Sequence, residues 1–240
     1  RIREQIWTLL EAALSAANRP PEALNEIVVA GNTVMESLFA GKSVAGMAAA
    51  PFRPDSLFFG PEGTGELNGV PVRLLPCVAG YVGGDITAGL MASGLGEKPG
   101  EHLFLDIGTN GEMAAGGADG FLVTSAAAGP VFEGGNISCG VAGVRGAVTN
   151  LVLERDPAAT GGIRTVELST IAGETPIGLC GTGIIDAVGE AVRLGLIDEN
   201  GTFEEPWFTD GMPVAEGRFR FRQEDVRQVQ MGKAAIRAGI

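Results

Sequence analysis

Apolar residues repeat at helical spacing in several segments of the chain. Over residues 2–18 they recur every three to four positions, which predicts an amphipathic helix that ends near Asn18 and the prolines after it. Similar but shorter patterns predict further helices over 33–40, from Asp85 onward, over 184–197 and over 224–238.

Short apolar or alternating runs predict strands between these helices. The strongest group spans residues 102–128, where HLFLDI, EMAAG and FLVTSA are separated by GTNG and GGADG, both typical of hairpins. Other strands are predicted over 26–30, 72–75, 146–154, 164–171 and the short run FRFR, whereas 41–70 and 200–217 are predicted to be irregular. Mixed strands and helices place the chain in the α/β or α+β class, with a three-strand meander inside it.

Composition adds an unusual glycine content to this pattern. Glycine supplies 38 of the 240 residues, more than twice the usual fraction of about 7%. Apolar residues make up 45%, too many for a disordered chain, and no Gly-X-Y period is present. The glycines therefore indicate tight turns, or backbone that must approach a ligand closely.

Charge and cysteine usage exclude several classes of protein. Lys and Arg total 17 against 29 Asp and Glu, a net charge of −12, which argues against nucleic acid or an anionic membrane as a partner. No apolar stretch is long enough to span a membrane, and the first residues lack the features of a signal peptide. The three separated cysteines are neither a disulfide framework nor a zinc motif, so we expect a cytoplasmic location.

The single histidine narrows the chemistry further. His102 opens the run HLFLDI, so a strand start is favoured over a catalytic base. Without histidine or cysteine clusters, a bound metal is expected to be a hard cation held by carboxylates and phosphates, such as Mg²⁺.

The segment LFLDIGTNGEMA contains the best candidate site. An apolar strand ends at Asp106, which is placed to hold Mg²⁺ or water, and the turn that follows is Gly108-Thr109-Asn110-Gly111. Such a turn can direct backbone N–H groups and two side-chain donors at an anion. An ordinary hairpin is an equal alternative, because Asn-Gly is the commonest pair in type I′ turns.

Three other glycine-rich turns join this candidate. Gly181-Thr182-Gly183 opens a helix and resembles the start of a dinucleotide fingerprint, but the motif is incomplete. Asp85 follows two glycines at the start of another helix, and Glu133 is the only charge in Gly129–Gly135. Gly41-Lys42-Ser43 is not a P-loop, since Glu36 stands where that motif needs glycine. Together these turns favour phosphate and Mg²⁺ binding over an inert scaffold.

Several long segments, in order, resemble the C-terminal region of the reductive activators of corrinoid proteins. They are VVAGNTVMESLFAG, LPCVAGYVGGDITAGLMASGL, LFLDIGTNGEMA, TSAAAGPVFEGGNISCGV, GLCGTGIIDAVGEAVRLGLID and RQEDVRQVQMGKAAIRAGI. The resemblance implies the superfamily of acetate and sugar kinases, 70-kDa chaperones and actin, with ribonuclease H-like lobes, a mixed sheet and flanking helices. It also implies ATP-dependent return of cob(II)alamin to cob(I)alamin on a partner corrinoid protein, with an electron from a [2Fe-2S] domain of the complete protein.

The same resemblance assigns roles to individual residues. Asp106 with Gly108–Gly111 is similar to the second phosphate-binding loop, and Asp85 to the acidic residue of the first connecting segment, which positions Mg²⁺ or the attacking water. Asp85 and Asp106 are thus the catalytic candidates, and Asp106 is the metal ligand. The nucleotide-binding candidates are Gly108, Thr109, Asn110, Gly111, Glu133, Gly181, Thr182, Gly183 and Lys233, with Gln230 a weaker one.

The departures from the family pattern set the remaining expectations. The family's first phosphate loop, its adenosine-side Gly-Gly-Phe-Gly segment and its ferredoxin cysteines are not found, so we expect a fragment with weak or no ATPase activity by itself. We expect residues 1–100 to belong to the first lobe with its connecting segment, and 101–240 to an incomplete second lobe. A corrinoid-protein docking module, or another kinase or activator of the superfamily, are the alternatives, and a homodimer is left open.

Overall fold

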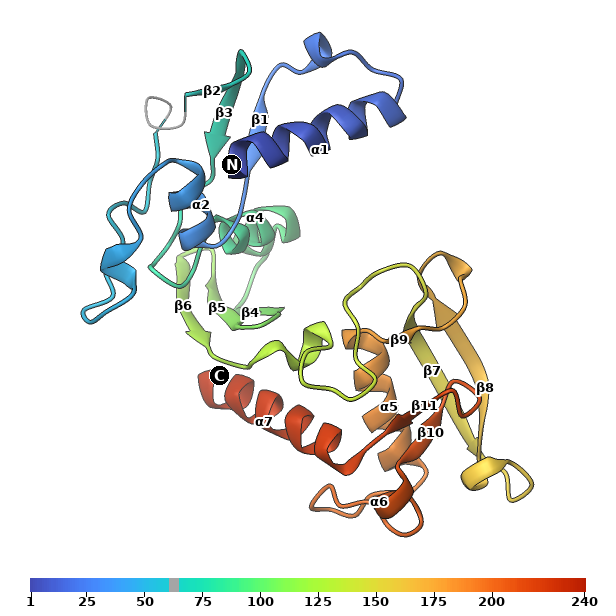
Figure 1. Ribbon diagram of the computed structural model, residues 1–240. Coiled ribbons are helices and arrows are strands. Elements are labelled where there is room, and N and C mark those ends of the chain that lie inside the picture. Colours follow the sequence, from blue (N-terminus) through green and yellow to red (C-terminus); the bar gives the residue numbers. More distant parts are fainter. Residues whose placement is uncertain (61–64) are drawn as a thin grey trace. The chain divides into compact units, whose positions relative to one another are not determined.

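The computed structural model describes residues 1–60 and 65–240, apart from the side chain of Thr160, and divides into two compact units (Figure 1). The first unit comprises Arg1–Leu105 and Glu112–Ser125, and the second comprises Asp106–Gly111 and Ala126–Ile240. The boundary therefore crosses one hairpin, whose turn belongs to the second unit while most of its two strands belongs to the first.

The first unit is built on a small sheet in the order β1-β3-β2. Its strands are β1 (Ile27–Val29), β2 (Glu66–Leu67) and β3 (Val70–Leu74); β1 and β3 are parallel, and β2 and β3 are antiparallel. The helices α1 (Ile2–Ala16) and α2 (Thr33–Phe39) pack against the sheet. Alternation along β3 buries Val70, Val72 and Leu74 in a core that also receives Phe39 from α2 and, less completely, Ile6, Trp7 and Leu10 from α1.

A helix and an antiparallel meander complete the first unit. Helix α4 (Gly84–Ser93) ends at Gly94, whose φ of 62° is the left-handed conformation that glycine adopts most easily. The meander consists of β4 (His102–Ile107), β5 (Gly111–Gly117) and β6 (Gly120–Ala126), in that order. The ring of Phe104 in β4 fills the space that a side chain at Gly89 of α4 would need, so the helix approaches the strand closely.

The second unit contains the larger hydrophobic core. Strands β8 (Ile163–Thr170), β7 (Ala147–Arg155) and β9 (Gly178–Leu179) form a sheet in that order, and α5 (Gly181–Arg193) packs along β7. Leu151 and Leu153 of β7 and Ile184 of α5 are almost fully buried in this core.

The chain ends in a short hairpin and a long helix. After α6 (Trp207–Asp210), strands β10 (Met212–Val214) and β11 (Phe219–Phe221) pair antiparallel, and α7 (Gln223–Gly239) follows. The buried carboxylate of Asp225, in the first turn of α7, accepts hydrogen bonds from the backbone N–H of Arg222 at 2.7 Å and from the backbone N–H and hydroxyl of Ser138 at 2.7 and 2.5 Å. Three donors satisfy most of the acceptor capacity of this buried group and tie the Ser138 loop to α7.

The predicted elements are largely present, with differences in the irregular segments. Short elements were missed in both regions that we predicted to be irregular: β2 and a 3₁₀ turn at Ala45–Met47 within 41–70, and α6 and β10 within 200–217. Helix α5 begins at Gly181 rather than at 184, so Gly181-Thr182-Gly183 forms its first turn. Strand β4 does begin at His102, as expected. No helix among the described residues has the length and apolar character to cross a membrane.

Shortening a buried side chain of the second unit should destabilise the protein more than shortening an exposed one. Replacing Leu153, which is 0% exposed in β7, with alanine removes buried methyl groups and leaves a cavity, so the free energy of unfolding should fall by about 2–5 kcal/mol. Val192 on α5 is 60% exposed, and Val192→Ala should change this free energy by no more than about 0.5 kcal/mol. Urea unfolding of both variants checks the difference, and equal losses would contradict this assignment of the core.

Candidate functional site

The turn between β4 and β5 presents its polar side chains to solvent. Asp106 near the end of β4, and Thr109 and Asn110 in the turn, are exposed, whereas Gly111 at the start of β5 is buried. The N–H of Gly108 donates to the carbonyl of Asn110 at 2.8 Å. None of these residues has a positive φ, so this is not the type I′ turn that the Asn-Gly pair suggested.

Glu133 lies against this turn. It ends a 3₁₀ turn, Pro130–Glu133, and its carboxylate accepts a hydrogen bond from the hydroxyl of Thr109. A Cβ added at Gly108 would lie 3.5 Å from the same carboxylate, an ordinary contact. The structure therefore brings together two of the predicted glycine-rich segments, 108–111 and 129–135, within the second unit.

The first turn of α5 packs onto the same 3₁₀ turn. A Cβ at Gly181 would overlap the carbonyl oxygen of Phe132, and one at Gly183 would overlap that of Val148. These two glycines are therefore needed for close backbone packing. The exposed member of the turn is Thr182, whose hydroxyl is 3.4 Å from the thiol of Cys180. Among the described residues no side chain caps this helix end, and uncapped helix N-termini in general can receive an anion.

Helix α7 meets the 3₁₀ turn from another direction. A Cβ at Gly232 would lie 2.7 Å from Val131 and 3.0 Å from the ring of Phe132, so this contact also depends on glycine. The neighbouring Lys233 is exposed. The amide of Gln230 is already engaged, donating to the carbonyl of Asn200 at 2.9 Å and accepting from Arg227 at 2.7 Å. Lys233 is thus the better placed of the two for a ligand.

Asp85 belongs to the first unit. It is half-buried in the first turn of α4, where its carboxylate accepts from the N–H of Ile86 at 2.9 Å. Its own N–H donates to the carbonyl of Gly31 at 3.3 Å. The two preceding glycines are packed tightly, because a Cβ at Gly83 would overlap the carbonyl of Gly31. Asp85 is therefore held at the carboxyl-terminal end of β1, just beyond the strand.

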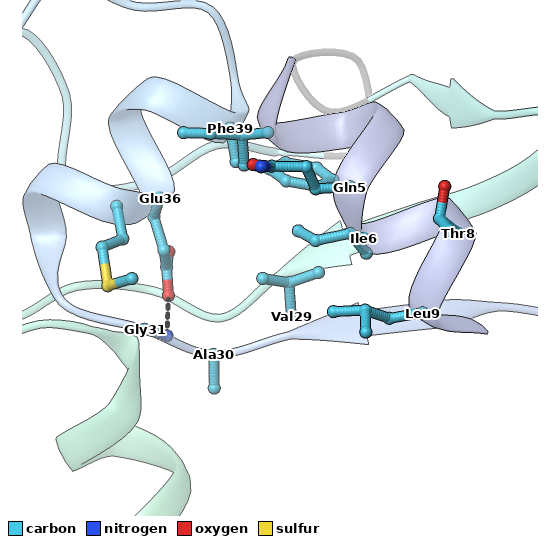
Figure 2. Close-up of a pocket in the computed structure, with 11 residues that line it drawn as sticks. Gln5, Ile6, Thr8, Leu9, Val29, Ala30, Gly31, Glu36 and Phe39 are labelled. Atoms are coloured by element: carbon cyan, nitrogen blue, oxygen red, sulfur yellow. Dashed lines mark hydrogen bonds between the residues drawn. The ribbon is translucent and has the colours of Figure 1, made fainter. Parts of the chain in front are cut away.

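Sequence reasoning missed Glu36, which lies beside this turn. Glu36 is 1% exposed, and its carboxylate accepts from the N–H of Gly31 at 2.9 Å (Figure 2). Burial, followed by the negative charge of Asp85 as a smaller cause, raises the pKa of this carboxyl. Its position on a helix gave no sign of burial, because a single glutamate on a short helix usually faces solvent.

An apolar cavity opens beside Glu36. It has a volume of about 710 Å³ and is lined by α1, the end of β1 and α2. Figure 2 shows Ile6, Leu9 and Val29 along its wall, with the carboxylate of Glu36 turned toward Gly31. None of the residues predicted from sequence to bind a nucleotide lines this cavity.

Metal-binding groups are sparse in the described residues. No cluster of three or more His, Cys, Asp or Glu side chains that could hold a metal ion occurs among them, and all three cysteines are free thiols. Mg²⁺ needs no such cluster, since one or two carboxylates with phosphate oxygens and water complete its shell. The role of Asp106 as a metal ligand stays a prediction.

Comparison with known proteins matches the chain along almost its whole length. The model of the RACo middle region matches residues 1–98, and that of the C-terminal domain of RACo, the ASKHA domain, matches residues 101–240. ASKHA denotes the superfamily of acetate and sugar kinases, 70-kDa chaperones and actin. The second match confirms the expected actin-like α/β fold.

Individual relatives agree with these models. The corrinoid activation enzyme RamQ of Eubacterium limosum is 30% identical over 99% of this chain and 43% of its own length. A [Co(II) methylated amine-specific corrinoid protein] reductase of Methanosarcina barkeri is 27% identical over 90% of this chain and 44% of its own length. The solved structure of a reductive activator for corrinoid, iron-sulfur protein superposes with a TM-score of 0.78 at 30% identity, over 99% of this chain and 40% of that protein. The chain thus spans less than half the length of the relatives it matches.

Two glycines of α5 provide a test of the close packing at this site. Gly181→Ala should lower the free energy of unfolding by about 1–3 kcal/mol, because the added methyl overlaps the Phe132 carbonyl and forces the 3₁₀ turn away. Gly189→Ala on the same helix meets nothing within 4 Å and should instead stabilise the protein by about 0.5–1 kcal/mol. Chemical denaturation compares the two, and a neutral Gly181→Ala would show that the turn is not held as described.

Proposed function

Because the chain belongs to the RACo family of reductive activators of corrinoid proteins, we propose that it carries the nucleotide-binding region of a corrinoid-activating ATPase. In this proposal the complete protein uses ATP to return cob(II)alamin to cob(I)alamin on a corrinoid methyltransferase subunit or corrinoid iron-sulfur protein. The reaction adds one electron to the cobalt and is driven by hydrolysis of ATP to ADP and phosphate.

The observation that carries this proposal is the likeness, over 99% of the chain, to a reductive activator for a corrinoid, iron-sulfur protein. The names of both curated relatives also refer to corrinoid activation or to reduction of a corrinoid protein. The names of these relatives do not support the alternative of another kinase or activator of the superfamily.

The second unit would hold the phosphates of ATP through the cluster around the β4–β5 turn. Gly108–Gly111 would approach the phosphates, with the exposed side-chain amide of Asn110 as a donor, whereas the single proton of the Thr109 hydroxyl already goes to Glu133. Asp106 would hold Mg²⁺, which neutralises phosphate charge when bound. Thr182 at the uncapped start of α5 and the ammonium group of Lys233 would add further favourable contacts. Because Glu133 already accepts the Thr109 hydroxyl, it would orient that side chain.

Asp85 lies in the first unit, and its proposed role follows from its own surroundings. A half-buried carboxylate fixed at the start of α4 is suited to orient a water molecule for attack on a phosphate, or to bind water of the Mg²⁺ shell. In this proposal residues 1–100 belong to the first lobe and its connecting segment, and 101–240 to the second. The electron would come from a [2Fe-2S] cluster bound outside this chain, since the three cysteines here are separate free thiols.

Removing the proposed metal ligand tests the nucleotide site. In the complete protein, Asp106→Ala should weaken binding of Mg-ATP about 10- to 100-fold, the usual loss when a charged partner is deleted. The control is Asp119→Ala, in the exposed turn between β5 and β6, which should bind Mg-ATP normally. Isothermal titration measures both, and unchanged affinity in Asp106→Ala would remove this residue from the site.

The overall activity is tested with a corrinoid protein trapped as cob(II)alamin. With the complete protein and a reductant, absorbance should report formation of cob(I)alamin with ATP, and little or none with a non-hydrolysable analogue. Asp106→Ala should behave as the analogue does, while Asp119→Ala retains activity. Equal reduction with and without ATP would refute ATP-driven activation.

A further inference from the structure

Glu36 is a buried carboxyl group whose two oxygens both have partners. One oxygen accepts from the N–H of Gly31 at 2.9 Å, and the thiol of Cys77 lies 3.5 Å from the other. Burial raises the pKa of the Cys77 thiol to about 11, so at neutral pH the thiol is protonated and donates to the carboxyl group. Glu36 thereby connects the end of β1 with the segment that follows β3.

The same carboxyl group lies directly against the start of α4. A Cβ added at Gly84 would overlap one oxygen of Glu36 and would lie 2.9 Å from the carbonyl of Leu75. The next residue is Asp85, whose N–H donates to the carbonyl of Gly31. Gly31 is therefore held from two sides, with its N–H bonded to Glu36 and its carbonyl to Asp85.

We propose that Glu36 is a positioning residue for the ATPase reaction: it fixes the Gly31 turn against the first turn of α4 and so sets the orientation of Asp85. This inference rests on the proposed function, in which Asp85 orients water or the Mg²⁺ shell. Glu36 itself touches neither nucleotide nor metal in this role. It acts only through the backbone of Gly31 and the close approach of Gly84.

Filling this space alone would not need a carboxyl group. The cavity beside Glu36 is lined mostly by apolar residues, and a methionine of similar length would fill the same volume without the cost of burying a carboxyl group. The thioether sulfur of methionine is only a weak acceptor for the N–H of Gly31, whereas the side-chain carbonyl of glutamine is a strong one. The pair of substitutions therefore separates the hydrogen bond from the volume of the side chain.

The test compares Glu36→Met with Glu36→Gln in the complete protein. Glu36→Met should lower kcat for ATP hydrolysis about 10- to 100-fold, as expected for a misplaced reacting group, with KM for ATP within about twofold of the wild type. Glu36→Gln should retain kcat within about threefold. The exposed Glu22→Met serves as the control, and thermal unfolding confirms that each variant is folded. If Glu36→Met does not fold, Glu36→Asp replaces it, with the same expected loss of kcat because the shorter side chain cannot reach Gly31.

A double-mutant cycle with Asp85→Asn shows whether Glu36 acts through Asp85. Asp85→Asn alone should lower kcat strongly, and adding Glu36→Met should then cause no further loss. Wild-type kcat in Glu36→Met, equal losses in the Met and Gln variants, or a full additional loss in the double variant would each overturn the proposal for Glu36. A wild-type kcat in Asp85→Asn would instead refute the role assigned to Asp85, and the proposal for Glu36 would fall with it.

Discussion

The contact between the Phe132 carbonyl and the backbone at Gly181 determines how the second unit is assembled. It allows the first turn of α5 to sit directly on the 3₁₀ turn that ends at Glu133. The same 3₁₀ turn also contacts α7 at Gly232 and the β4–β5 turn through Thr109. Three segments far apart in sequence therefore meet around Pro130–Glu133, and a side chain at either glycine would separate them.

Charge imposes a second constraint on this cluster. With a net charge of −12, the chain has few cations to offer a phosphate, and the candidate site includes the carboxylates of Asp106 and Glu133. In the proposed site, favourable interactions with a phosphate would come from oriented N–H groups, from Lys233 and from a divalent cation. Through its hydrogen bond from the hydroxyl of Thr109, the carboxylate of Glu133 lies directly at the β4–β5 turn.

The sequence allowed the main elements to be predicted, but not the reason for its glycines. Alternation identified the β4–β6 meander, and helical spacing identified α1, α5 and α7, because these patterns depend on local periodicity. We interpreted the glycine-rich turns as space for a phosphate. At Gly181 and Gly183 the structure shows that the space is taken by protein atoms. Those contacts, like the burial of Glu36, depend on segments distant in sequence, which a local pattern does not encode.

The buried Asp225 has a mechanical consequence for the second unit. Its hydrogen bonds join the Ser138 loop to the first turn of α7, and separating the two would leave the buried carboxylate with the N–H of Arg222 as its one remaining donor among those described above. These bonds couple the Ser138 loop to the start of α7, so a ligand bound at Lys233, two turns further along the helix, would act on that loop through the helix.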